Sequence, residues 1–170
     1  MDLALSDEQQ ALVSSFEQLL LKGASPEQVR SAEPTGFDEA LWGTLTDTGA
    51  VVMAVGEEQG GWGASLLDLS LVAEQLGRRA APAPLIEAQV AARLLASVAP
   101  QALDPVLEGE VLTLSLHPPV GGVARLVPAG AVATSTLVLD GDRLLLVPIS
   151  DDDRQPVRNL ASAPLADVSV

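Results

Sequence analysis

The sequence predicts an α+β fold in which an N-terminal all-α helical bundle is followed by a small antiparallel β-domain. Up to residue 109, apolar residues recur at helical spacing, and serine-led capping signals precede several of these runs. From residue 110 the apolar runs become short and strand-like, and an Asp-Gly pair separates two of them. Helices first and strands second favour an α+β architecture. We expect a helical domain over residues 1–109 and a β-domain over residues 110–170.

Two capping boxes predict the first two helices. Ser6 is followed three residues later by Gln9, and an apolar stripe at i, i+4, i+7 and i+8 leads to a stop at Gly23. Ser25 and Gln28 repeat the signal, with a proline in the first helical position. We expect this second helix to be short and to end near residue 33.

Three further helices are expected before residue 100. Residues 38–48 form the third, with a buried apolar connector over residues 50–55 behind it. A serine opens the fourth helix at residue 65 and Gly77 closes it, while residues 85–98 form an alanine-rich fifth helix. Residues 100–109 leave room for one more turn. The residues of the third helix expected to face inward are Leu41, Trp42 and Leu45.

The strands are expected after residue 110. Residues 111–116 and 123–127 read as two strands. Residues 135–139 and 143–149 flank Asp140-Gly141, which predicts a hairpin with a type I′ turn. Three aspartates at residues 151–153 form a solvated turn, and residues 160–170 contain one more weak strand.

Composition narrows the functional classes. The 170-residue chain has a net charge of −14, of which −11 falls on residues 1–109 and −3 on residues 110–170. Nucleic acids and anionic membrane surfaces need a basic footprint, so neither is an expected partner. The chain has no cysteine, which excludes disulfides, thiolate metal sites and a cysteine nucleophile. The start lacks a signal peptide and no apolar run reaches the ~20 residues of a membrane span, so we expect a cytoplasmic protein.

The most informative stretch is residues 37–84, and its motifs resemble those of the acyl-CoA dehydrogenases, a family of flavin enzymes. Residues 57–63 read Glu-Glu-Gln-Gly-Gly-Trp-Gly, similar to the family's "P-E-E-x-G-G-x-G" loop, with Gly56 in place of the proline. Residues 72–78 read Val-Ala-Glu-Gln-Leu-Gly-Arg, similar to its "v-x-E-E-L-G-R" helix end. The resemblance extends over most of residues 3–99. It implies a helical domain followed by a partial or shortened middle β-domain.

The resemblance also implies a cofactor, a substrate and partners. The cofactor is FAD, the substrate is an acyl-CoA thioester, and the chain is a subunit of a homo- or hetero-oligomer with an acyl-CoA dehydrogenase subunit. The family's flavin-contacting "T-E-P-x-x-G-S-D" segment falls on residues 116–123, where its threonine, glutamate, serine and aspartate are replaced. The candidate cofactor-binding residues are Leu116, His117, Pro118, Gly121 and Gly122.

Three residues are candidates for substrate binding, and each has a structural alternative. Trp62 lies in the glycine-rich loop, where it could line an acyl or flavin pocket or pack two parts of the chain together. Arg78 could contact a coenzyme A phosphate or could stabilise a helix C-terminus. Arg125 is a second phosphate candidate. His117 is the only histidine, without the spacing of a metal site, and we expect it to be a turn residue.

No catalytic residue is assigned, because the family places its catalytic glutamate in a second helical domain. Three functions remain open. The chain could be a flavoprotein subunit that takes part in FAD-dependent α,β-desaturation of an acyl-CoA. The replaced flavin-contacting residues motivate the second, a non-catalytic scaffold subunit of a heteromeric acyl-CoA dehydrogenase that does not bind flavin by itself. The third is an isolated helical interaction module.

Overall fold

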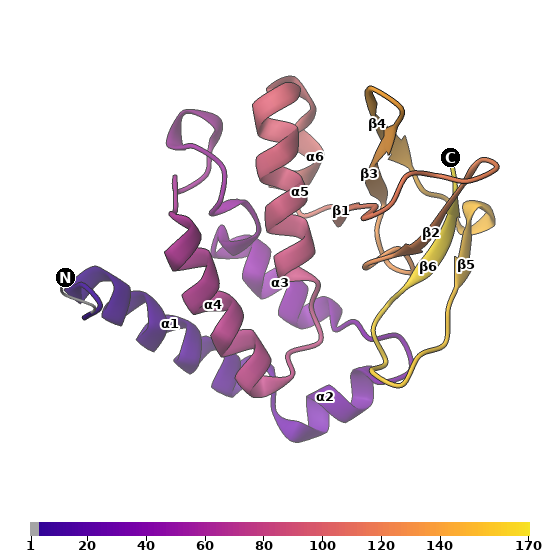
Figure 1. Cartoon of the computed structure of the whole chain (residues 1–170). Helices are drawn as coiled ribbons and strands as arrows, with labels where there is room; N and C mark the ends of the chain where they lie inside the picture. Colours follow the sequence, from indigo (N-terminus) through magenta and orange to yellow (C-terminus); the bar gives the residue numbers. More distant parts are fainter. Residues whose placement is uncertain (1–3) are drawn as a thin grey trace.

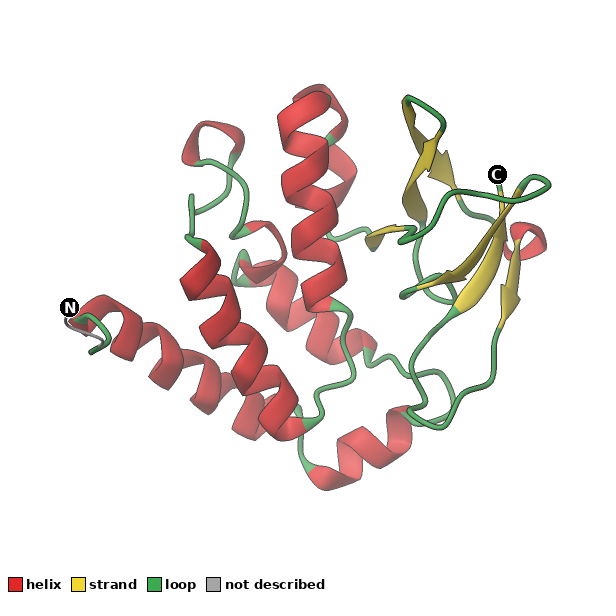
Figure 2. Ribbon diagram, in the orientation of Figure 1, coloured by secondary structure: helices red, strands yellow, loops and turns green. Residues whose placement is uncertain are grey.

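The chain folds into a helical half and a β-half, as a computed structural model that describes residues 4–170 shows (Figure 1). The helices are α1 (Asp7–Gly23), α2 (Pro26–Ala32), α3 (Glu39–Asp47), α4 (Leu66–Arg79), α5 (Leu85–Val98) and α6 (Asp104–Leu107). The strands are β1 (Leu112–Leu114), β2 (Val123–Val127), β3 (Ser135–Asp140), β4 (Arg143–Pro148), β5 (Arg154–Pro156) and β6 (Ala166–Ser169). Helices and strands occupy separate sides of the molecule (Figure 2), which confirms the α+β prediction.

The predicted helix starts are present. At each of three helices the N-cap serine accepts a hydrogen bond from the third helical residue, whose side chain accepts one back from the serine N–H. The pairs are Ser6 with Gln9, Ser25 with Gln28, and Ser65 with Asp68. The amide of Gln9 also donates to the Asp68 carboxylate at 3.1 Å, so the caps of α1 and α4 are joined.

The prediction for the end of α4 was wrong. Gly77 does not close the helix, which continues through Arg79. Ala80 then takes the left-handed conformation (φ 48°), and its N–H bonds back to the carbonyls of Leu76 and Gly77. A left-handed residue after the last turn is a common way to satisfy terminal carbonyls, and here alanine rather than glycine adopts it.

The connector over residues 50–55 is buried at every position, as predicted, and begins with a 3-10 turn. The glycine-rich loop that follows packs directly on it. A β-carbon on Gly61 would lie 2.2 Å from the Val55 carbonyl oxygen and 2.5 Å from that of Val52. Only a residue without a side chain lets the two backbones approach this closely.

The β-half consists of two three-stranded sheets, ordered β1-β3-β4 and β2-β6-β5. Three of the four pairs of neighbouring strands are antiparallel, and the fourth pairs β1 with β3 in parallel. The β-half is therefore antiparallel, as predicted, apart from this one parallel pair. The chain reaches β3 only after passing through β2 in the other sheet, so it re-enters the first sheet in the same direction.

Two local predictions in this half need correction. The β3–β4 turn pairs Asp140 with Arg143, so its central residues are Gly141 and Asp142, and only Gly141 has a positive φ (63°). This is the pattern of a type II′ turn and not the type I′ turn expected from Asp-Gly. The short strand β5 was not predicted, because a three-residue run containing arginine and proline has no apolar alternation.

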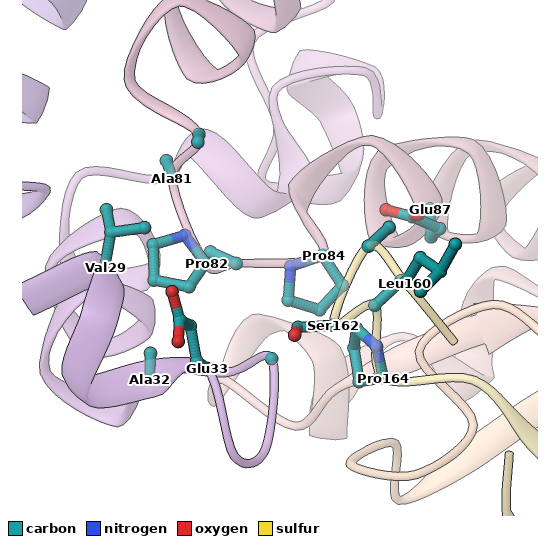
Figure 3. A pocket seen from close by; sticks show the side chains of 15 residues that line it. Val29, Ala32, Glu33, Ala81, Pro82, Pro84, Glu87, Leu160, Ser162 and Pro164 are labelled. Carbon is teal, nitrogen blue, oxygen red and sulfur yellow. The ribbon is translucent and has the colours of Figure 1, made fainter. Parts of the chain in front are cut away.

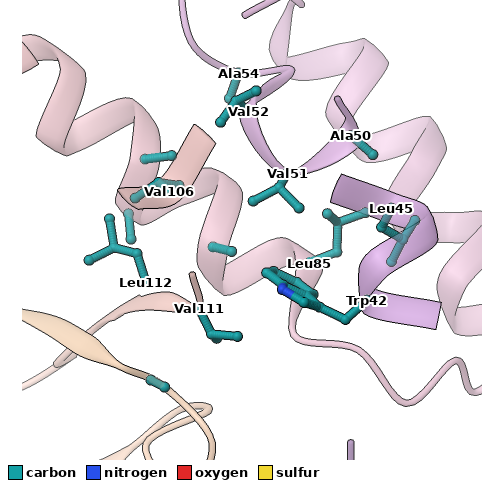
Figure 4. Close-up of a cluster of buried hydrophobic side chains, with 14 of the residues drawn as sticks. Trp42, Leu45, Ala50, Val51, Val52, Ala54, Leu85, Val106, Val111 and Leu112 are labelled. Atoms are coloured by element: carbon teal, nitrogen blue, oxygen red, sulfur yellow. The ribbon is translucent and has the colours of Figure 1, made fainter. Parts of the chain in front are cut away.

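The core is continuous from the helices into the sheets. α5 packs against the 3-10 turn Ala50–Val52 and against β1, and the side chains between them are drawn in Figure 4. The buried indole of Trp42 donates from Nε1 to the Gly109 carbonyl at 2.7 Å, at the point where the chain leaves the helices. The change from helix to strand falls between Leu107 and Leu112, near the predicted boundary at residue 109. Whether the two parts are separate domains stays a prediction.

Within residues 4–170, no helix is both long and apolar enough to cross a bilayer. The expectation that the chain starts without a signal peptide depends partly on residues 1–3, which lie outside the described residues.

Replacing Gly61 by alanine is expected to lower the free energy of unfolding by about 1–3 kcal/mol, because two backbone carbonyls occupy the space of the new methyl group. Chemical denaturation of the two proteins measures this difference. Gly77→Ala is the matched control. It lies within α4 with nothing near its added methyl group, so it should stabilise by about 0.8–1 kcal/mol. Equal effects of the two substitutions would contradict the close backbone approach.

The Asp68 carboxylate predicts a pH-dependent contribution to stability. Its hydrogen bonds from Ser65, and from Gln9, hold its pKa below the ordinary value of 3.8. A pKa that is lower in the folded state stabilises the fold above the unfolded pKa, and this is lost as the pH falls through the folded pKa. Asp68→Asn should therefore flatten stability between neutral pH and pH ~3, measured by denaturation across that range. Asp47→Asn, an exposed aspartate with no such partners, should keep the wild-type profile.

Candidate functional site

The loop between β1 and β2 contains the five residues predicted to contact a cofactor. Ser115 continues the β1–β3 pairing by donating its N–H to the Leu137 carbonyl at 2.8 Å. Its hydroxyl donates to the His117 carbonyl at 2.7 Å. Leu116, His117 and Pro118 are all exposed, so the loop presents these three side chains outward.

The same loop ends in a tight turn. Val120 and Val123 exchange backbone hydrogen bonds of 2.9 and 3.3 Å, and the two residues between them are Gly121 (φ 61°) and Gly122 (φ 76°). Two consecutive positive φ angles in a two-residue connection are the pattern of a type I′ turn, which favours glycine at both positions. The turn geometry alone therefore accounts for glycine at both positions, without a bound ligand.

The hydrogen-bonding groups of this loop fit the rim of a flavin poorly. Between residues 114 and 123 the polar side chains are Ser115 and His117, and the Ser115 hydroxyl already has an acceptor. Leu116, Pro118 and Val120 provide no donor. A buried flavin edge that lacks its partners would cost about 1–3 kcal/mol for each unsatisfied group. The side chains of this loop suit contact with an apolar surface, and they do not supply the polar partners that FAD needs.

An apolar sheet face continues from this loop. Side chains alternate between the two faces of a strand, and the register pairs Leu114 with Leu137 and Leu137 with Leu146. Leu137 is 2% exposed. Leu146, its neighbour on β4, is 44% exposed, and Leu139, two residues further along β3, is 49% exposed. Leu116, two residues after Leu114, is 66% exposed. Leu116, Leu139 and Leu146 therefore continue the buried face of the sheet onto the exposed surface.

Trp62 packs against the helical half. Its indole Nε1 lies 2.8 Å from where a β-carbon on Gly49 would stand, so the ring covers the glycine that ends the third helical segment. The ring is still 40% exposed. The amide of Gln59, on the same loop, donates to the Ala96 carbonyl near the end of α5 at 3.2 Å. This packing agrees with the structural alternative for Trp62, and its role toward a substrate stays a prediction.

The two candidate arginines lie in different settings. Arg78, in the last turn of α4, forms an exposed 2.7 Å ion pair with Glu74 one turn earlier. Arg125, on β2, lines a shallow cleft that contains a second arginine, Arg154, and three carboxylates, those of Asp152, Asp153 and Asp167. A polyanion would meet repulsion from these aspartates, so the surroundings of Arg125 favour a phosphate less than its charge alone does.

The predicted site residues are not brought together into one cavity. Trp62 precedes the first turn of α4 and Arg78 is in its last turn, which separates them by about 18 Å of helix axis. The loop at residues 116–122 and Arg125 lie in the β-half. Among the residues described, no group of three or more histidine, aspartate or glutamate side chains could hold a metal ion.

Comparison with known proteins assigns the fold to a family. The model of the acyl-CoA dehydrogenase N-terminal domain matches residues 6–103, more than half of the chain. The chain belongs to the acyl-CoA dehydrogenase family. It is 35% identical over 165 residues to acyl-CoA dehydrogenase IpdE2 of Mycobacterium tuberculosis, which covers 91% of the chain and 50% of that relative. IpdE2 of Mycolicibacterium smegmatis is 33% identical, covering 82% and 45%.

Solved structures of this acyl-CoA dehydrogenase fold superpose along the whole chain. The ChsE4-ChsE5 complex from Mycobacterium tuberculosis has a TM-score of 0.83 at 22% identity, covering 100% of this chain and 55% of that one. The Tcur3481-Tcur3483 steroid ACAD variant has a TM-score of 0.76 at 24% identity, covering 96% and 55%. At these identities the likeness shows the fold. The chain spans about half the length of the acyl-CoA dehydrogenase relatives it matches.

One feature of this acyl-CoA dehydrogenase chain was missed by sequence reasoning. A cleft of about 430 Å³ lies between α2, the segment 80–84 and the loop 159–164, and it contains Glu33, Glu87 and Ser162. Its residues come from three distant parts of the sequence, so no single motif could reveal it. The one local signal was the alternating alanine and proline of residues 81–84, which predicted only a turn.

Substituting both turn glycines tests the geometry of the cofactor loop. The Gly121→Val and Gly122→Val double variant should lose the Val120–Val123 pairing, because a left-handed conformation costs an L-residue about 1–2 kcal/mol at each position. Amide exchange at Val123, measured by NMR, should become faster. Gly121→Asn is the matched control and should keep the slow exchange, since asparagine accepts this conformation. Unchanged exchange in the double variant would contradict the turn assignment.

Proposed function

We propose that this chain is an acyl-CoA dehydrogenase-type subunit that takes part in FAD-dependent α,β-desaturation of an acyl-CoA thioester. The observation that carries the proposal is the match of 91% of the chain, at 35% identity, to a curated acyl-CoA dehydrogenase. The reaction class and substrate class come from the family. We also propose that the protein works in the cytoplasm.

Within such an enzyme the helical half would form one wall of the acyl pocket. α5 is buried on most of its surface but exposes Ile86 and Val90, spaced one turn apart, as an apolar strip. An apolar helix strip suits an acyl chain, because it removes hydrocarbon surface from water without offering competing polar groups. Trp62, Arg78 and Arg125 remain the residues proposed for substrate contact, and no catalytic base is assigned in this chain.

FAD would be held mainly by a partner subunit, with residues 116–122 lying against it. The donor-poor loop supports this division, because leucine, proline and glycine can contact the flavin without hydrogen-bonding its rim. Two structural relatives carry the names of two components, ChsE4-ChsE5 and Tcur3481-Tcur3483. They support a hetero-oligomer in which this chain works beside a second acyl-CoA dehydrogenase subunit.

The same loop favours a second candidate function, a non-catalytic scaffold subunit that shapes the assembly and does not bind flavin by itself. The two functions differ in whether this chain changes the reaction or only the stability of its partner. A scaffold would raise the amount of folded partner and leave kcat and KM of the complex insensitive to substitutions on the exposed strip of α5. A subunit that lines the pocket would alter KM when Ile86 or Val90 is replaced by a polar residue.

Flavin content tests the proposal directly. The chain purified alone is expected to be colourless with added FAD, whereas co-expression with a family partner subunit should give a yellow complex. Leu116→Thr should increase FAD retention in the complex, because it adds a hydroxyl group that can donate to the flavin rim. Leu21→Thr, at an exposed leucine on α1, is the matched control and should leave FAD retention unchanged.

The outcomes separate the candidates. FAD binding by the chain alone would remove the scaffold function. Absence of flavin with every family partner tested would remove the dehydrogenase proposal. If in addition acyl-CoA failed to raise the unfolding temperature of any such complex, the isolated interaction module would be favoured, because a ligand that binds the folded form must stabilise it.

A further inference from the structure

The cleft between α2, the segment 80–84 and the loop 159–164, here called the proline cleft, has a mostly apolar wall with two carboxylates. Its volume of about 430 Å³ lies within the range of binding sites in general. Glu33 and Pro82 lie at one end in Figure 3, and Glu87 and Leu160 lie at the other. The apolar wall consists of Val29, Ala32, Ala81, Pro82, Pro84 and Pro164.

The loop on one side of the cleft is held rigidly. The Asn159 amide donates to the carbonyls of Val157 (3.1 Å) and Ala163 (2.8 Å), and its oxygen accepts from the N–H groups of Ala161 and Ala163. These four hydrogen bonds use most of the capacity of one side chain to fix a six-residue loop. The loop therefore keeps its shape without a ligand.

The opposite walls are fixed as well. Gly36, after α2, approaches the loop so closely that a β-carbon there would lie 2.1 Å from the Ser162 carbonyl oxygen. The Pro82 carbonyl accepts a hydrogen bond of 2.9 Å from the N–H of Asp38, at the start of α3. A cleft with rigid walls loses little conformational entropy when a ligand enters.

Leu160 stands at the rim of this rigid cleft, fully exposed. A single exposed leucine needs no explanation on most surfaces. Here Leu160 extends the apolar lining of the cleft to its rim, on a loop whose conformation is fixed by hydrogen bonds. A second cleft, of about 380 Å³, lies on the other side of the same loop and shares Glu33, Ser162 and Pro164. The two clefts flank the same loop and share part of its lining.

The negative charges of Glu33 and Glu87 favour some occupants of the cleft over others. Neither the Glu33 nor the Glu87 carboxylate has an ion-pair or hydrogen-bond partner among the residues that the structure describes, and Glu87 is half-buried. A second copy of this chain would bring a net charge of −14 toward these carboxylates, which disfavours self-association through this face. A lysine or arginine side chain would neutralise one of them and bury its aliphatic stem on the apolar wall.

We propose that the proline cleft docks an extended segment of a partner protein, in which an arginine or lysine is flanked by apolar residues. The basic group pairs with the half-buried Glu87, and the flanking apolar side chains contact Leu160 and the prolines. This docking interaction involves neither the flavin nor the acyl-CoA, so it can be tested independently of the proposed function.

NMR titration of the full isotope-labelled chain tests the proposal with a defined probe, the acetylated and amidated peptide Ala-Leu-Arg-Leu-Ala. Amide shifts are expected to change at Val29, Ala32, Ala81 and Leu160, with an affinity that falls as salt rises. The matched peptide Ala-Leu-Glu-Leu-Ala should bind at least about tenfold more weakly, as expected for loss of a charge-assisted hydrogen bond.

Surface variants make the test specific. The double variant Glu33→Gln and Glu87→Gln should weaken the arginine peptide about tenfold. Glu17→Gln with Glu58→Gln removes the same charge from exposed positions elsewhere and should not. Leu160→Ala should weaken it about fivefold, and Leu66→Ala, at another exposed leucine, should have no effect. No shift changes at the highest soluble concentration, shifts outside the cleft, or equal binding of both peptides would overturn the proposal.

Discussion

The position of α5 depends on contacts on two sides, and the rest of the fold depends on that position. On one side the buried amide of Gln89 donates to the Ala50 carbonyl at 2.9 Å, which ties the helix to the connector after α3. On the other side the helix packs against β1. The alanines at 88, 91 and 92 are all fully buried, and their small side chains let both neighbours approach the helix axis. The helical and β-halves therefore share one core, and the cleft and loop described above take their places from it.

The helical half could be predicted almost completely from the sequence, because its signals are local. Capping boxes, apolar spacing and the buried connector each act within a few residues, and the structure confirms them. The end of α4 escaped prediction because the stop depends on Ala80 adopting a left-handed conformation, which alanine rarely signals. The β-half was predicted less well. The pairing of β1 with β3 is set by the path through a second sheet, and no spacing within either strand records it.

The candidate site shows the same division between local and non-local information. The glycines at 121 and 122 could be found from sequence, but they are accounted for by a turn, and the neighbouring side chains offer one free donor to a flavin. The proline cleft could not be found, because Glu33, Glu87 and Ser162 come together only in the folded chain. Family membership explains the arrangement of the helices and sheets. It does not by itself explain an acidic cleft with a rigid rim, which is a property of these particular residues.

The parallel pair of β1 and β3 has a consequence for the order in which the chain folds. β3 and β4 are joined by a two-residue turn, so they can pair with little loss of chain entropy. Leu112 and Ser135 are neighbours in the sheet although the whole of β2 lies between them in sequence, so their contact closes a much longer loop. The hairpin should consequently be formed in the folding transition state while β1 is still unattached. Higher φ-values in β1 than in the hairpin would exclude this order. The strand that leads out of the helices would then be the last to enter its sheet, and the two halves would become one cooperative unit only at that late step.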